Sequence, residues 1–588
     1  MSSSNPFSRD EVQNTPEYKR IAAMPRRTWT PAQVEEITDR MTALLKTPAG
    51  TMRLRPIQAL ALYEAGTYGG LLGPISVGQG KELICFLMPR VTFAKHPLLI
   101  MPAHLVRRSE REMEEYGVHW RIPTNLRIIS YQMLGQAHHD KTLATVPPDL
   151  FILNECHRIK NKDAAVSRRV IRHMAQFPAA KFVAVSGTLL SKSVTDFAHI
   201  ARWCVKPCPL PSSYTELKEW SDALDEKPSG WNSREPGALL GLCNAEERTH
   251  EPVTAARMGF RRRLTETPGV VATEGGDDVA NAAGDPITLT VRALHYEQDP
   301  IVEAHFKNLR EEWATPSGWQ FSIAMGVWRH ARTLALGLHY RWDPEPEGGP
   351  EGPWCTARSA WKKFVRTAIK DSRGENVLDS ELQVTNACLK GALDCTTLNA
   401  WLREKPNYVP VSRAEWHCTG AIDAVQEWMR QGPGIVFTDH TFFAEELARR
   451  TGAKYFGAGG IDKNGLEIEK ADPNSCIIAS RVANSTGRNL QGWHRGLVTS
   501  SPHNALEWEQ MLGRFHRHGQ QHDVTFDLLV GCRENHDGWL RSLDLAQMTR
   551  DTLGASQKLL IARTEGFDSE FAMDLRPGFK WQKTLART

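Results

Sequence analysis

Two separate parts of the chain alternate short apolar runs with longer amphipathic stretches, and this alternation constrains the fold more than any other feature. In the first part the apolar runs cover residues 97–101, 127–130, 149–153 and 182–186. In the second part they cover residues 434–438, 476–480, 496–500 and 525–530. A continuous apolar run is typical of a strand that is buried on both faces. Because helical stretches separate the runs, we expect an α/β fold with two parallel sheets covered by helices.

Composition supports a globular protein and excludes several other classes. The chain has 588 residues, of which 41% are hydrophobic and 24% charged, so it is neither mostly disordered nor fibrous. A length of this size predicts two to four domains, at about 100–200 residues each. The net charge of +4 is too small to indicate or exclude nucleic-acid binding.

The sequence also predicts where the protein resides. It begins MSSSNPFSRDEVQ, without the apolar core of a signal peptide, and no window is apolar over the ~18 residues that a membrane span needs. Its 11 cysteines are scattered, which is typical of reduced thiols. We therefore expect a cytoplasmic protein that makes no contact with a membrane.

Changes in pattern along the chain predict six segments. The sequence is divided into a helical N-terminal extension (1–50, with a helix over 31–45), a first domain (51–265, with a helical insertion from about 200), a linker (266–286), a helical, Trp-rich region (287–425), a second domain (426–545) and a C-terminal tail (546–588). Tryptophans of the Trp-rich region can stack on bases, but in helices they more often pack in a core or bind a protein partner.

A Gly-rich segment, GPISVGQGKE at 73–82, has the context of a phosphate-binding loop. A strand-like lead precedes it and an apolar helix follows Lys81. Gly78 and Gly80 let backbone N–H groups close around a phosphate, and Lys81 can meet the outer phosphates. The alternative is a plain turn, and Glu82 stands where such loops carry Ser or Thr.

Two further segments carry polar residues suited to phosphate chemistry. In DLFILNECHRIKN, a buried run ends at Asn154 and Glu155, and a carboxylate there can polarise an attacking water. In QMLGRFHRHGQ at 510–520, the three-residue spacing of Arg514 and Arg517 predicts that both lie on one face of a helix, as arginine fingers. The alternatives are a solvated strand end and an exposed basic helix.

Taken in order, these segments resemble the motifs of Swi/Snf-type ATPases of helicase superfamily two, over residues 50–535. LRPIQ at 54–58 resembles the adenine-side motif, NECH the DEAH box and SGTLLSKSVTDF at 186–197 the coupling motif. TGRNLQGW at 486–493 resembles the loop that contacts nucleic acid, and QMLGRFHRHGQ the final arginine motif. Small members of this build include proteins encoded by bacteriophages.

The resemblance implies two RecA-like domains in tandem that face each other across an ATP cleft, with ATP and Mg²⁺ as cofactors. It implies catalytic roles for Glu155, Gln510, Arg514 and Arg517. It implies cofactor binding by Arg55, Gln58, Gly78, Gly80, Lys81, Glu82 and Gly487. The metal ligands would be Glu82, Asn154 and Glu155.

The ATP site departs from the family at two positions. Glu82 replaces the usual Thr, and Asn154 replaces the first Asp of the box. One hypothesis is that the metal-facing charge has moved across the site to Glu82, because Mg²⁺ accepts carboxylate oxygens from any side. The competing hypothesis is decay, in which Glu82 repels the phosphates and hydrolysis is lost.

The function that the resemblance implies is an ATP-dependent translocase that moves on double-stranded DNA and remodels or displaces bound protein. The alternatives are a strand-separating DNA or RNA helicase, and a nucleotide-binding scaffold with little hydrolysis. A basic stripe in WKKFVRTAIK, formed by Lys362, Arg366 and Lys370, could follow a phosphate backbone or be an ordinary solvated surface. The Trp-rich region could bind a protein partner.

Overall fold

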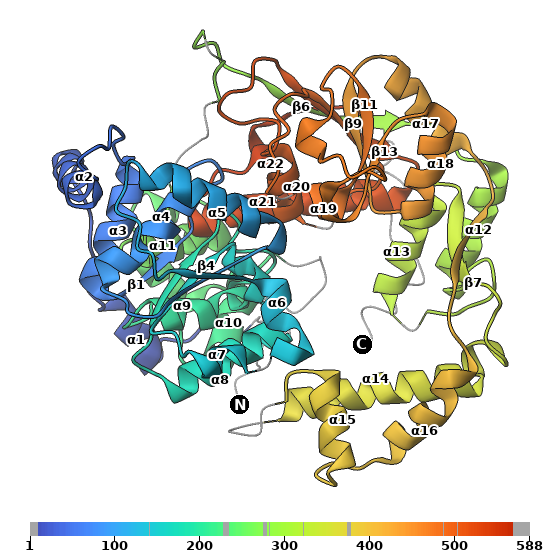
Figure 1. Cartoon of the computed structure of the whole chain (residues 1–588), viewed down its shortest axis with the longest axis horizontal. Helices are drawn as coiled ribbons and strands as arrows, with labels where there is room; N and C mark the ends of the chain where they lie inside the picture. Colours follow the sequence, from blue (N-terminus) through green and yellow to red (C-terminus); the bar gives the residue numbers. More distant parts are fainter. Residues whose placement is uncertain are drawn as a thin grey trace, which may run out of the picture. The chain divides into compact units, whose positions relative to one another are not determined.

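The computed structural model describes residues 10–139, 141–226, 234–273, 279–281, 283–321, 323–372, 378–485, 487–502 and 504–567. Two compact units make up the chain, and each is described by itself (Figure 1). Unit 1 comprises 1–276, 369–383 and 544–557, and unit 2 comprises 277–368, 384–543 and 558–588. No helix within the described ranges has the length and apolar character needed to cross a membrane.

Unit 1 is built on a five-stranded sheet in which every strand pair is parallel. The strand order is β1-β5-β4-β2-β3. The strands are β1 (Gly70–Gly73), β2 (Pro97–Met101), β3 (Arg127–Ser130), β4 (Leu150–Asn154) and β5 (Lys181–Val185). The predicted runs match these strands to within one residue, because strands buried on both faces leave continuous apolar sequence.

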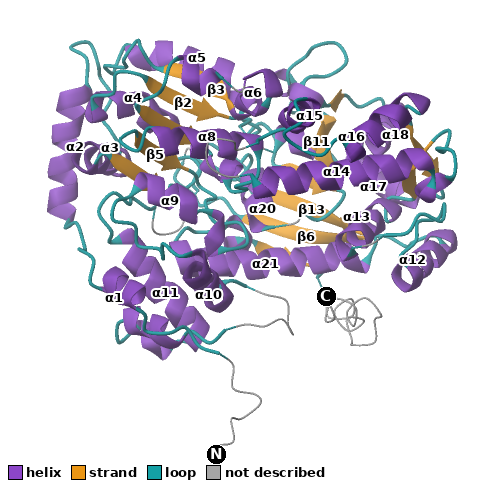
Figure 2. Cartoon of the chain, turned by 90° about the horizontal axis from the view of Figure 1, so that it is seen from below, coloured by secondary structure: helices purple, strands orange, loops and turns teal. Residues whose placement is uncertain are grey.

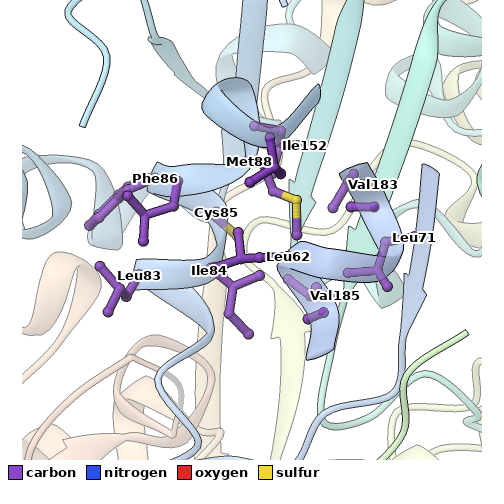
Figure 3. Close-up of a cluster of buried hydrophobic side chains, with 14 of the residues drawn as sticks. Leu62, Leu71, Leu83, Ile84, Cys85, Phe86, Met88, Ile152, Val183 and Val185 are labelled. Carbon is purple, nitrogen blue, oxygen red and sulfur yellow. The ribbon is translucent and has the colours of Figure 1, made fainter. Parts of the chain in front are cut away.

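Helices pack on this sheet, and the hydrophobic core lies between the helices and the strands. They are α3 (Pro56–Tyr68), α4 (Lys81–Thr92), α5 (Ala103–Gly117), α6 (Tyr131–Gly135), α7 (Thr142–Thr145), α8 (Ala165–Gln176) and α9 (Ala198–Cys204). Figure 3 shows the core between the first two of these helices and the sheet. Leu62 of α3 and Ile84 of α4 lie there against Leu71, Ile152 and Val183, which come from three different strands. The start of α4 is thereby held rigidly over the end of β1.

The remaining helices of unit 1 come from the N-terminus and from the segment after the sheet. They are α1 (Pro16–Ala22), α2 (Pro31–Leu45), α10 (Tyr214–Leu224) and α11 (Pro252–Thr265). The structure confirms the helix predicted over 31–45, which begins with a capping box at Thr30 and Gln33. Arg263 of α11 is fully buried and donates hydrogen bonds to the carbonyl oxygens of Met24 (2.9 Å) and Pro25 (2.8 Å). Its side chain ties the N-terminal segment to the unit.

Unit 2 contains a seven-stranded sheet whose strand pairs are also all parallel. The order is β10-β11-β9-β12-β13-β6-β14. The strands are β6 (Leu289–His295), β9 (Gly434–Thr438), β10 (Tyr455–Phe456), β11 (Cys476–Ser480), β12 (Arg495–Val498), β13 (Val524–Val530) and β14 (Arg563–Glu565). Figure 2 shows β13 and β6 side by side, paired in register over seven residues.

The prediction of a helical region at 287–425 is wrong in three places. Residues 289–295 form strand β6, and β7 (Leu338–Trp342) pairs with β8 (Ser412–Trp416) as an antiparallel ribbon. The helices of unit 2, together with three (α14, α15 and α21) that are divided between the units, are α12 (Pro300–Glu312), α13 (Ala324–Leu334), α14 (Pro353–Asp371), α15 (Glu381–Leu389), α16 (Thr396–Glu404), α17 (Gly420–Arg430), α18 (Thr441–Thr451), α19 (Arg481–Asn484), α20 (Ala505–Leu512), α21 (Arg533–Leu553) and α22 (Lys558–Ile561). Residues 546–567, which the sequence assigns to a tail, contain the end of α21, α22 and β14.

We expect Arg263→Ala to destabilise unit 1. The substitution leaves two backbone carbonyls without their charged donor, and a hydrogen bond to a charged group contributes about 1.5–3 kcal/mol. Thermal unfolding followed by circular dichroism should show a clear fall in the midpoint. The matched control is Arg261→Ala on the same helix, a partly exposed side chain with a long, 3.4 Å hydrogen bond to the carbonyl of Arg550. Equal midpoints for the two variants would contradict this role.

Candidate functional site

The candidate site lies at the carboxyl edge of the sheet of unit 1. Because β1, β4 and β5 are parallel, the segments that follow them meet at one edge, which is where α/β sheets bind ligands. These segments are the Gly-rich loop, the NECH segment and the SGT segment (186–188). A Cβ placed on Gly187 would lie 3.1 Å from the backbone nitrogen of Val77, so the loop and the SGT segment are in direct contact.

The Gly-rich loop has the backbone that its glycines predict. Gly78 and Gly80 have φ angles of 89° and 71°, in the left-handed region that other residues rarely adopt. Gly80 is also the residue immediately before helix α4, whose first residue is Lys81. The backbone N–H groups at the start of this helix have no partners within the helix and therefore favour an anion.

Lys81 is buried and faces the inside of the loop. Its side chain is 8% exposed, and Nζ donates a hydrogen bond to the carbonyl oxygen of Ser76 at 3.1 Å. Residue Ser76 lies in the same loop, so the ammonium group is held within the curve of the backbone. A phosphate placed in that curve would meet both the ammonium group and the N–H groups of the helix start.

Arg55 and Gln58, the predicted adenine-side residues, contact the loop from the start of α3. Arg55 Nη1 donates to the carbonyl of Gly78 at 2.8 Å. Gln58 Nε2 donates to the carbonyls of Gln79 (3.4 Å) and Gly80 (3.3 Å). Both side chains therefore hold the backbone of the loop in place.

Glu82 belongs to a pair of carboxyl groups. Burial, together with a hydrogen bond to the carboxylate of Glu112 on α5, raises the pKa of Glu82 to about 8. The pKa of Glu112 is lowered, as the hydrogen bond from Glu82 and the neighbouring Arg108 outweigh its own burial. Arg108 Nε lies 2.6 Å from Glu112. Near pH 7 Glu82 is therefore a neutral acid that donates to Glu112, a partner to which no pattern in the sequence points.

Glu155 is held in a network of short polar contacts at the end of β4. Its carboxylate accepts a hydrogen bond from the Ser186 hydroxyl at 3.1 Å and lies 3.3 Å from His157 Nδ1. Thr188 Oγ1 lies 3.1 Å from the same histidine nitrogen. Burial lowers the pKa of His157, so the ring is neutral near pH 7. The sequence predicted Glu155 and the coupling motif but assigned no role to His157.

The backbone of Glu155 adopts a conformation that is unusual for its residue type. Its φ and ψ are 60° and 54°, in the left-handed region. Such strain in a residue other than glycine costs about 1–3 kcal/mol and is concentrated at functional sites. Here it turns the carboxylate toward the hydroxyl of Ser186.

Asn154 provides a buried oxygen beside this network. The residue is 2% exposed, and its Oδ1 has no hydrogen-bond partner among the described residues. The backbone carbonyl is occupied by the Tyr131 hydroxyl at 3.0 Å. A buried polar atom without a partner is rare in proteins, and this one is suited to a metal-bound water.

The prediction that Arg514 and Arg517 lie on one helical face is wrong. Helix α20 ends at Leu512, and residues 513–519 form successive turns. Gly513 follows the helix directly, and a residue without a Cβ favours such an end. Arg514 is buried, with Nε donating to the carbonyl of Ser485 at 3.3 Å, whereas Arg517 is half-buried. Gln510, the third predicted catalytic residue of unit 2, is buried on α20.

The basic side chains near the motifs are mostly paired inside the protein. Gly487 has a φ of 70°, as a turn requires, and the adjacent Arg488 lies 3.1 Å from Glu469. Arg262 lies 2.9 Å from Glu247. By contrast Lys362 and Arg366 of α14 are exposed.

Comparisons with known proteins give no family. No protein-family model matches the chain, and no curated protein matches it.

We expect Glu82→Gln to flatten the pH dependence of stability of unit 1. A carboxyl group whose pKa is raised on folding binds its proton more tightly when folded. The stability that Glu82 contributes is therefore fully present below pH about 4.3, the pKa of glutamate in the unfolded chain. It is lost as the pH rises to about 8, the pKa in the folded protein. Glutamine keeps the neutral shape and cannot ionise, so this loss should disappear.

Urea unfolding between pH 5 and pH 9 measures the effect. The matched control is Glu110→Gln, an exposed glutamate on α5, which should keep the slope of the unmodified protein. If the free energy of unfolding of Glu82→Gln changed with pH as steeply as that of the unmodified protein, the carboxyl pair would not form.

Proposed function

We propose that unit 1 binds ATP at the Gly-rich loop and hydrolyses it with Glu155. The observation that carries the proposal is the meeting of the loop, Glu155 and Ser186 at one edge of a parallel sheet. Lys81 supplies a positive charge for the outer phosphates, and the start of α4 supplies N–H donors. The order of motifs along the chain supports the same activity.

In this proposal Glu155 orients and polarises the water that attacks the γ-phosphate. The carboxylate is 18% exposed, so it is accessible at the edge of the sheet. His157, whose pKa is lowered by burial, is neutral near pH 7 beside this carboxylate.

The protonated state of Glu82 bears on how Mg²⁺ would be held. We propose that Glu82, protonated and paired with Glu112, does not supply the metal-facing charge near pH 7. The donors that remain are the Asn154 amide oxygen, Glu155 and the phosphates themselves. We therefore propose that Mg²⁺ arrives with ATP and is held by the protein through water.

The wider proposal follows the motif resemblance. Units 1 and 2 each contain a parallel sheet, which is compatible with two RecA-like domains. We propose an ATP-driven translocase on double-stranded DNA, with Arg514 and Arg517 stabilising charge on the transferred phosphate. A second candidate, a nucleotide-binding scaffold, is favoured by one observation, the neutral and paired Glu82 in place of a metal-binding hydroxyl.

ATP hydrolysis by purified variants tests the first proposal. Lys81→Ala should lose both nucleotide binding and turnover, whereas Glu155→Gln should bind ATP and turn it over at least ~100-fold more slowly, the typical contribution of a general base. Arg517→Ala should retain binding and lose turnover, since arginine fingers contribute about 10³–10⁵ in rate.

The control for these variants is Lys95→Ala, an exposed lysine of the same unit, which should hydrolyse ATP like the unmodified protein. Nucleotide binding without turnover in the unmodified protein, with and without duplex DNA, would favour the scaffold. Unchanged turnover in Glu155→Gln would refute the proposed site.

DNA affinity should fall with salt and depend little on sequence. If α14 lies on the phosphate backbone, Lys362→Glu with Arg366→Glu should lower the slope of log affinity on log salt by ~1.8, since each neutralised phosphate contributes ~0.9. The control is Lys390→Glu with Lys405→Glu, which makes the same change of charge at exposed positions. Equal slopes for the two double variants would show that α14 does not lie on the phosphate backbone and is an ordinary solvated surface.

A further inference from the structure

Unit 2 contains a group of metal-ligating side chains on the ribbon formed by β7 and β8. His339, Glu415 and His417 each direct one ligand atom to a common place, and these atoms lie within 4.8 Å of one another. None of the three belongs to the motifs that carry the proposed ATP site.

The strand pairing explains why these side chains converge. His339 of β7 is the direct cross-strand partner of Glu415 of β8. His417 follows Glu415 by two residues, and residues two apart on a strand lie on the same face. The backbone N–H of His417 donates to the carbonyl of Gly337 at 2.7 Å, so the pairing continues past the end of β8 and fixes His417.

The two imidazole rings face each other through nitrogen atoms. His339 Nδ1 lies 2.9 Å from His417 Nε2, and the ring planes are 6° apart. His339 is fully buried, and its other nitrogen, Nε2, has no hydrogen-bond partner among the described residues. The ring of His339 is therefore already removed from water, and its hydrogen bond to His417 is made through Nδ1. A ligand that binds this ring does not have to strip water from it.

Neighbouring side chains hold the group in place. The ring of His305 on α12 packs on His417 with centroids 4.4 Å apart. The ring of His330 on α13 lies 5.9 Å from that of His339. Arg341 Nε donates to Glu415 Oε2 at 2.9 Å, which orients the carboxylate, as supporting partners do for carboxylate ligands of metals.

We propose that His339, Glu415 and His417 bind a divalent transition-metal ion of the Zn²⁺ class. Two imidazole nitrogens and one carboxylate oxygen suit zinc, whereas Mg²⁺ and Ca²⁺ prefer oxygen ligands alone. Three protein ligands leave a fourth position for water.

To admit the ion the two rings must both separate and turn, because their facing nitrogens now point at each other rather than at a common point. Two nitrogens bound to a tetrahedral zinc at about 2.1 Å lie about 3.4 Å apart, compared with 2.9 Å between the facing nitrogens here. The rings therefore separate by about half an ångström, and the proton shared between them moves to the far nitrogen of one ring. The ion then replaces the hydrogen bond as the link between the strands.

Metal binding by the full chain, without an affinity tag and stripped of metal by a chelator, tests the proposal. Zn²⁺ is titrated in competition with a chromophoric chelator, and Co²⁺ is used as a spectroscopic substitute. We expect the unmodified chain to bind one ion more than Glu415→Gln and His417→Gln, or to bind it at least ~10-fold more tightly, since loss even of a supporting partner weakens binding 10–100-fold. The visible spectrum of bound Co²⁺ should show nitrogen and oxygen ligands.

The matched control is His522→Gln, which alters another pair of neighbouring histidines, His494 and His522, with ring centroids 5.1 Å apart. This variant should bind Zn²⁺ like the unmodified chain. Because the chain has 11 cysteines, a thiolate band in the Co²⁺ spectrum would identify binding elsewhere and overturn the assignment.

The test remains decisive if His417→Gln folds poorly. Glu415 is 47% exposed in its side chain, so Glu415→Gln should keep the fold, which circular dichroism checks. Zn²⁺ should raise the thermal midpoint of the unmodified chain and not that of Glu415→Gln. Equal affinity in these two proteins would show that the histidines form only a hydrogen-bonded pair.

Discussion

The placement of β5 between β1 and β4 is the constraint on which the site of unit 1 depends. Strand β1 leads into the loop that ends at Lys81, and β4 leads to Glu155. These two strands are not neighbours in the sheet, and the segment after β5 fills the space between their ends. That segment begins Ser186-Gly187-Thr188. Ser186 contacts Glu155, while Gly187 packs on the loop, where a Cβ would lie a tight 3.1–3.2 Å from backbone atoms of Val77 and Ile75. The fold thus couples the loop and the carboxylate through three small residues.

The parts of the fold that the sequence predicted share one physical cause. Strands β2, β3, β9 and β11 match their predicted runs residue for residue, and β2 and β9 are buried along their whole length. Strand β6 was missed because its burial alternates. Leu289 and Val291 are buried, while Thr290 and Arg292 are partly exposed. Its partners come from residues more than 200 positions away in the sequence, so no local pattern announces them.

The sequence was enough to predict which residues belong to the candidate site. It was not enough to predict how they are paired or which of them lie in a helix. Gly78, Gly80 and Lys81 could be found because positive φ angles and a helix start leave a sequence signal. The pairing of Glu82 with Glu112 could not be found, because it depends on how α4 packs on α5. Arg514 and Arg517 are a second case in which local sequence does not determine the structure. Their spacing fits a helix, but the helix ends before either residue.

Buried polar atoms without partners connect the two candidate sites. Leaving such an atom unpaired costs about 1–3 kcal/mol, a large fraction of the 5–15 kcal/mol that holds a domain folded. Asn154 Oδ1 lies at the strand ends of unit 1, and His339 Nε2 lies on the ribbon of unit 2. In each case a hydrophobic residue of similar size would fill the space at no such cost. At Asn154 the unpaired oxygen is itself the atom that a metal-bound water would complete, whereas at His339 the ion would bind Nδ1 and the buried Nε2 would hold the proton of the ring.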